Sequence, residues 1–281
     1  YRLVIRKAAP DFALVAWPLH MELRNGDRNA LSKPLALRGG TTMALEVIAF
    51  RRDGFDGDIE LSMEGLPEGV SAHGLKIPPG QSRGLMLVSA EENAPRAFAN
   101  ARFFGRGQVD GQTVTRPCHL ASVAWPIPDS WSEIPSPRLM DDVPVSVSGH
   151  EKAPLTLAPS TTDFLTVVAG DKLTVGLKHL RRSEFSGATM QARIMGATFD
   201  RAPGFDLNVT ADESQVTFDT AALKATPGDY LVAVYGGAVA KFRAKPTENP
   251  TDIAGQRPHI GPLAALRLEH GVAIIRLFYQ G

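Results

Sequence analysis

Short stretches in which every second residue is apolar dominate the chain. In 41–50, TTMALEVIAF, and in 171–180, DKLTVGLKHL, one parity is mostly apolar and the other mostly polar. A period of two over this length predicts a strand with one buried face. Turn signals such as PEG, PPGQ, DG and TPGD separate these stretches, and no helical patterns stand between them. The pattern predicts an all-β fold made of sandwiches rather than βαβ units.

The same strand pattern occurs twice. FRRDGFDGDIEL, 50–61, and LRRSEFSGATMQ, 180–191, share two arginines, a Phe and a Gly at an offset of 130 positions. The offset then becomes 131, and it reaches 132 where APRAFANARFFG matches TPGDYLVAVYGG. After each one-residue shift the apolar positions of the two stretches still coincide, provided that the register of the comparison moves with the insertion. Matching strands thus follow in the same order in both halves of the chain. The sequence therefore predicts two tandem immunoglobulin-like β-sandwich domains that arose by internal duplication.

The boundaries of these domains follow from the turn and proline content. We expect a residual strand of a preceding domain or an edge strand in 1–9, a first sandwich in 10–125, a proline-rich linker in 126–142, a second sandwich in 143–245, and a C-terminal extension in 246–281. The extension opens with loop residues and ends on GVAIIRLFY, a β-forming stretch. An open edge of this kind invites aggregation, so we expect the stretch to be paired.

Composition excludes several classes of protein. The 30 basic and 30 acidic side chains give zero net charge, and no basic stripe suited to nucleic acid is present. No apolar run is long enough for a membrane span. Cys118, the single cysteine, excludes an internal disulfide and a multi-cysteine zinc site. The chain opens on Tyr1, and we expect a fragment or a processed chain whose export signal has been removed.

One further pattern resembles a known family. A Gly before a long strand, then RRDGFDGDIELSMEGLPEGV (51–70), PPGQS and an AP turn resemble immunoglobulin-like modules of large bacterial surface proteins. The resemblance is to modules that accompany bacterial pre-peptidase C-terminal domains in planctomycete-type proteins. It implies an exported or cell-surface multidomain protein without shared catalytic residues. The second repeat departs from the pattern, because GATFDRAPGF stands where the first has its GLPEGV turn.

The paired arginines and the acidic loop of the first repeat are the first candidates for a site. Arg51 and Arg181 could bind sulfate, uronate or carboxylate, but recurrence at one position of both repeats favours a structural role, with each guanidinium on backbone carbonyls or a carboxylate. Asp53, Asp56 and Asp58 could gather oxygens around Ca²⁺. The matching loop SEFSGA keeps one acid, Glu184, which favours a solvated turn.

The remaining chemistry-bearing residues also favour structural roles. The seven histidines lack HxH and HxxxH spacing, and we expect His179 to be a hydrogen-bonded core residue. Cys118 and His119 are adjacent on a strand and face apart, so they form no catalytic dyad. The sequence shows neither GxSxG nor a nucleotide-binding glycine loop, and GRGQVDG at 105–111 indicates a hairpin. We predict no catalytic, cofactor-binding or metal-binding residue.

Aromatic residues and one modification motif leave alternatives open. Trp17, Trp125, Trp131 and Tyr235 could form a carbohydrate-stacking platform, although a plug at the domain junction is the favoured interpretation. NVT at 208–210 matches a glycosylation sequon, a motif that means little by itself in a bacterial chain.

The sequence thus predicts a non-catalytic spacer or docking module of an exported protein, at the periplasm, cell surface or outside the cell. Its partners would be other domains of the same polypeptide, surface proteins or possible polysaccharide ligands. The alternatives are a carbohydrate-binding accessory module of a secreted hydrolase and an accessory of a secreted peptidase.

Overall fold

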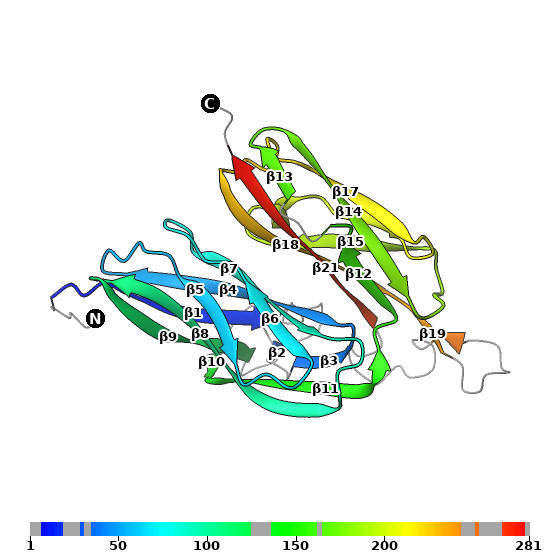
Figure 1. Ribbon diagram of the computed structural model, residues 1–281, viewed down its shortest axis with the longest axis horizontal. Coiled ribbons are helices and arrows are strands. Elements are labelled where there is room, and N and C mark those ends of the chain that lie inside the picture. Colours follow the sequence, from blue (N-terminus) through cyan, green and yellow to red (C-terminus); the bar gives the residue numbers. More distant parts are fainter. Residues whose placement is uncertain are drawn as a thin grey trace. The chain divides into compact units, whose positions relative to one another are not determined.

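The computed structural model describes residues 7–18, 29–30, 35–124, 136–161, 165–242, 251–252 and 266–278 (Figure 1). Within these residues the chain is nearly all β, as the alternating pattern predicts, and the one helical element described is the 3₁₀ turn η2, Phe199–Arg201. By contacts the chain forms two compact units. Unit 1 contains 1–36, 45–88 and 97–146, and unit 2 contains 37–44, 89–96 and 147–281.

Unit 1 has the strand order of an immunoglobulin-like sandwich. Its path includes β1-β4-β7-β6, while β5, β8 and β9 pair with one another in the order β5-β8-β9. These are the orders of the two sheets of a seven-stranded sandwich of this class. The strands are β1 (Asp11–Pro18), β4 (Thr42–Arg52), β5 (Glu60–Glu64), β6 (Val70–Gly74), β7 (Arg83–Ala90), β8 (Ala97–Val109) and β9 (Gln112–Ala124).

Four further strands join the sheet of β1. They are β2 (Asn29–Ala30), β3 (Leu35–Gly39), β10 (Ser136–Met140) and β11 (Asp142–Lys152). β10 runs antiparallel to β9, with Ser136 opposite Ala124 and Met140 opposite Leu120. The predicted linker 126–142 therefore contains a paired strand, while its residues 126–135 lie outside the described part of the chain. The predicted strand YRLVIR lies outside it as well.

Unit 2 repeats much of this order. β12 (Leu155–Pro159), β14 (Lys172–Arg181) and β17 (Glu213–Asp219) are neighbours, as are β16 (Phe205–Asn208), β15 (Thr189–Met195), β18 (Gly228–Ala238) and β21 (Leu266–Phe278). β13 (Leu165–Val168) pairs with β21, and β19 (Lys241–Phe242) pairs with β20 (Thr251–Asp252). Where the first repeat has its GLPEGV turn, η2 buries Phe199 against Phe218 and Tyr230, with ring centroids 5.1 and 5.2 Å apart.

The C-terminal strand is paired along both sides. β21 runs antiparallel to β18, and it runs parallel to β12 and β13. The expectation that GVAIIRLFY is paired is confirmed for its described residues, 271–278. Ile275, Arg276 and Leu277 have a partner on both sides, in β18 and in β13.

In each unit an early strand runs parallel to a later one. In unit 1, Leu14, Val15 and Ala16 of β1 lie opposite Cys118, His119 and Leu120 of β9. In unit 2, Thr156 lies opposite Glu269, and Leu165 opposite Ile275. A parallel pair begins at one end of the sandwich and finishes at the other. From the start of β1 to the end of β9 the chain of unit 1 therefore passes from one end of the sandwich to the other, and β10 then runs back beside β9.

Candidate functional site

Arg51 is held by backbone oxygens at the end of β4. Its Nε donates to Gln81 O at 2.9 Å and its Nη1 to Gly57 O at 2.6 Å. Its Nη2 donates to Ile77 O and Pro78 O at 3.3 and 2.7 Å. Four carbonyls thus share one guanidinium, which ties two loops to the strand. The predicted carbonyl contacts of Arg51 are confirmed.

Arg181, at the matching position of β14, makes the same kind of contact with longer bonds. Its Nη1 donates to Val209 O and Ala211 O at 3.3 and 3.4 Å, and its Nη2 lies 3.5 Å from a carboxylate oxygen of Asp212. Both arginines therefore bind carbonyls of the loop that leads into the neighbouring strand, which is β7 for Arg51 and β17 for Arg181.

The three aspartates of the acidic loop bind three different partners. Asp53 accepts from the N–H of Ala9 at 3.1 Å, and Asp56 accepts from the N–H of Gly80 at 2.6 Å. Asp58 lies 3.8 Å from Lys76 Nζ. Within the described residues no cluster of three or more metal-ligating side chains occurs. The loop carboxylates act on neighbouring backbone and lysine rather than on one shared point.

A pocket of about 370 Å³ opens beside this loop, lined by Ala9, Pro10, Asp11, Arg52, Asp53 and Arg116. At its side, Arg116 Nε donates to Asp11 at 2.8 Å. Burial opposes ionisation of Asp11, but the hydrogen bonds from Arg116 and from the N–H of Phe12 lower its pKa on balance. The ion pair therefore fixes the start of β1 to β9.

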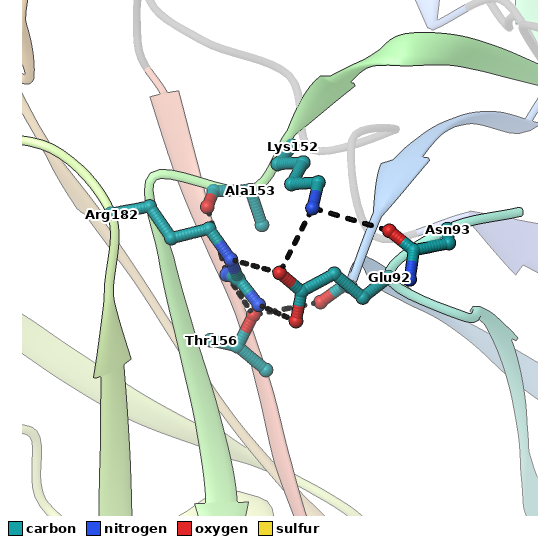
Figure 2. A network of polar contacts seen from close by, with 7 residues as sticks. Glu92, Asn93, Lys152, Ala153, Thr156 and Arg182 are labelled. Atoms are coloured by element: carbon teal, nitrogen blue, oxygen red, sulfur yellow. Dashed lines mark hydrogen bonds and ion pairs between the residues drawn. The ribbon is translucent and has the colours of Figure 1, made fainter.

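A cluster of polar side chains surrounds Arg182, which follows β14 in unit 2 (Figure 2). Arg182 donates through Nε and Nη2 to both oxygens of Glu92, at 3.3 and 3.0 Å. Its Nη1 donates to Ala153 O at 3.0 Å and to Thr156 Oγ1 at 2.8 Å. Lys152 Nζ adds a second cation on Glu92 at 3.1 Å and also reaches Asn93 Oδ1 at 3.2 Å. We call these residues the Glu92 network.

The Glu92 network joins four segments that are distant in sequence. Thr156 Oγ1 accepts from Arg182 and donates to Gly40 O at 2.9 Å, so 37–44 is tied in along with 89–96. Gly40 has φ +78°, and a Cβ there would stand 3.1 Å from both Arg182 Nη2 and Thr156 Oγ1. Glycine at this position therefore satisfies the backbone and also leaves room for the guanidinium.

Two cations set the charge state of Glu92. The hydrogen bonds from Arg182 and then Lys152 lower the pKa of this carboxyl from 4.5 to about 2. The Glu92 side chain is 42 % exposed, whereas the Arg182 side chain is only 15 % exposed. Arg182 is thus the anchored partner, and the bidentate geometry is of the kind that carboxylate–guanidinium pairs favour.

The sequence pattern did not reveal the Glu92 network. Arg182 stood out as the second arginine of its pair, but Glu92 and Lys152 carry no motif and belong to different segments. The acidic residues of the turn EENAPR were the visible signal. The local spacing of residues does not say which cation Glu92 binds.

His179 and Cys118 occupy structural positions. His179 Nδ1 and Nε2 lie 2.9 Å from Ala211 O and 2.8 Å from Ser214 Oγ, and burial lowers its pKa. The predicted hydrogen-bonded histidine is confirmed, although its side chain is only half-buried. Cys118 is fully buried, and burial raises the pKa of its thiol.

The predicted aromatic platform is placed only in part. Trp17 and Tyr235 are both half-buried, Trp17 in unit 1 and Tyr235 in unit 2. Trp125 and Trp131 lie outside the described residues.

Comparisons with known proteins give structural likenesses alone. No family model matches the chain, and no curated protein matches it. Among solved structures, domains 5-6 of the S-layer protein SbsC are 11 % identical with a TM-score of 0.27, covering 89 % of this chain and 95 % of that one. The D0-D1 domain of intimin is 8 % identical with a TM-score of 0.25, covering 94 % and 99 %. Among the described residues no helix is long and apolar enough to span a bilayer.

Proposed function

We propose that the chain is a non-catalytic spacer or docking module of an exported or cell-surface multidomain bacterial protein. The observation that carries this proposal is the end-to-end path of the chain in unit 1, from the start of β1 to the end of β9. Because β1 runs parallel to β9, a domain attached before β1 and one attached after β9 are held apart by the length of the sandwich. A strand of 13 residues such as β9 spans about 40 Å.

The polar contacts support the same function. Arg51 binds four carbonyls of its own unit, and the Glu92 network holds four segments together. These charged groups fix loops to strands, and a spacer requires such fixed loops to keep its shape. The resemblance to immunoglobulin-like surface modules points in the same direction, including the association with pre-peptidase C-terminal domains.

We also propose that the two units arose by duplication. β4 and β14 differ by the offset of 130 positions that the arginine pairs show. Their pairings correspond as well: β1–β4 and β12–β14 are antiparallel, β5–β8 and β15–β18 are antiparallel, and β8–β9 corresponds to β18–β21. The main difference is that β6 covers the edge of β7 in unit 1, whereas among the described strands of unit 2 the order ends on β17.

That difference indicates where a docking role would act. His179 N donates to Asp212 O at 2.8 Å, so alternate residues of the strand that follows bond toward β14. The N–H and C=O groups of Glu213, Gln215 and Thr217 then point away from β14. An extended partner segment could add to this edge through backbone hydrogen bonds.

Pulling a single molecule in two directions tests the spacer function. Cysteine handles at Ala8 and Ala124 load β1 against β9 in shear, because all the bonds between the strands must break together. Handles at Ala8 and Thr113 attach at one end of the same pair and peel it. We expect a higher unfolding force in the first geometry. Equal forces in the two geometries would remove the mechanical basis of the proposal.

A further inference from the structure

One sequence motif has no part in the proposed function. Asn208-Val209-Thr210 fits N-x-S/T with a residue other than proline in the middle. The chain has a second Asn-x-Thr at 249–251, but Pro250 occupies its central position. The chain thus contains one sequon that satisfies the rule and one that breaks it.

Strand alternation places the recognised residues of the sequon on a single exposed side. Asp206, Asn208 and Thr210 are exposed, whereas Leu207 and Val209 are 1 % and 0 % exposed. Val209 is further held by its N–H, which donates to Ala188 O at 2.9 Å. The buried pair anchors the segment, and the polar side chains face solvent.

Two hydrogen bonds orient the asparagine side chain. Thr210 donates to Asn208 Oδ1 from its N–H at 2.9 Å and from its hydroxyl at 2.7 Å. The backbone N–H can only donate, so the atom that it meets must be the amide oxygen. In the part of the chain that the structure describes, Nδ2 makes no hydrogen bond. The amide nitrogen is therefore the outward atom.

The position in the sheet leaves room for a large substituent. Asn208 is the last residue of β16, and among the strands that the structure describes β16 ends the order of its sheet, with β15 as its neighbour. The pair Thr189–Asn208 is the outermost rung of that ladder. The end of a terminal strand opens at low cost in free energy, so an enzyme can reach it without unfolding the unit.

We propose that Asn208 is the acceptor of an N-linked glycan. In the reaction Nδ2 bonds to the anomeric carbon of a lipid-pyrophosphate-linked oligosaccharide, and the bond from that carbon to the phosphate oxygen breaks. The lipid pyrophosphate leaves as an anion, and Nδ2 releases one proton to the solvent. The inference presupposes export, which belongs to the proposed function.

Modification by a supplied enzyme tests the acceptor directly. The whole chain is incubated with a purified bacterial oligosaccharyltransferase and its lipid-linked oligosaccharide, and intact mass is measured. We expect a gain of one glycan, located by trypsin on the peptide 202–224. Asn208→Gln and Thr210→Ala should abolish the gain, while Thr210→Ser should retain it. Thermal unfolding of each variant checks that the unit remains folded.

The second sequon is the internal control. Asn249 should stay unmodified, because Pro250 occupies the central position of its sequon. An unchanged mass in a reaction that glycosylates a known acceptor peptide would overturn the inference, as would a full gain in Asn208→Gln. Because the enzyme is supplied, this result is independent of where the protein resides and of the pulling experiment.

Discussion

At the scale of single residues, the arginines and aspartates that the sequence offers as ligand-binding groups contact other parts of the protein. The guanidinium of Arg51 has a geometry that fits an anion, yet four carbonyl oxygens surround it. Sequence comparison of the two repeats already indicated this, because the arginine persists while Asp53, Asp56 and Asp58 do not. What local sequence could not supply was the identity of the carbonyls, which belong to loops up to 30 residues away.

Replacing Arg51 should therefore cost stability. Arg51→Ala leaves several partly buried carbonyls without a donor, and we expect a loss of about 1–3 kcal/mol in the free energy of unfolding. The measurement is the urea midpoint of unfolding. Arg52→Ala is the matched control, since Arg52 is exposed at the adjacent position, and it should change stability by less than about 0.5 kcal/mol. Equal losses in the two variants would contradict the role assigned to Arg51.

The thiol of Cys118 should be inert in the folded protein. It is fully buried and its pKa is raised, so little thiolate forms and reagents have no access. Ellman's reagent should give no signal in buffer and one thiol per chain in denaturant. Rapid reaction in buffer would place Cys118 elsewhere than in the core.

At the scale of elements, the strands were largely predictable and their partners were not. The alternating pattern located β4 and β14. The turn of the β8–β9 hairpin was also predictable, because an Asp-Gly pair favours a tight turn in which both residues adopt positive φ, as Asp110 and Gly111 do at 50° and 78°. The pairing of β10 with β9 and the insertion of β21 between strands of unit 2 depend on contacts across many residues. A local pattern carries no information on these contacts.

The Glu92 network should make stability depend on acid pH. The pKa of Glu92 is about 2 in the folded chain against 4.5 for a free carboxyl. Its stabilising contribution is then complete above pH 4.5 and is lost as the pH falls toward 2. Urea midpoints of the wild type and Glu92→Gln should differ most above pH 4.5 and converge near pH 2. Glu91→Gln, the adjacent exposed residue, is the control and should show no such convergence.

A gap between wild type and Glu92→Gln that stays constant from pH 6 to pH 2 would show that the carboxylate charge contributes nothing. In that case the packing of Arg182 beside Ala153 and Thr156, rather than the ion pair, would hold the four segments.

At the scale of the whole molecule, the proposed function depends on how the chain passes through unit 1. In the proposed function, the parallel pairing of β1 with β9 places an attachment before β1 and one after β9 at opposite ends of the pair. Alternation in the sequence predicted the class of fold, but the parallel pair became evident only from the register of β1 and β9.

Distances within unit 1 test this threading most directly. Spin labels are placed on cysteines at the exposed positions 8, 113 and 138, while buried Cys118 stays unlabelled. Arg138 lies opposite Ser122 of β9, nine residues beyond position 113. We predict that labels at 8 and 113 are close enough to broaden each other's spectra, and that labels at 8 and 138 are about 30 Å farther apart. Equal separations for the two pairs would contradict the end-to-end path of the chain and the spacer function with it.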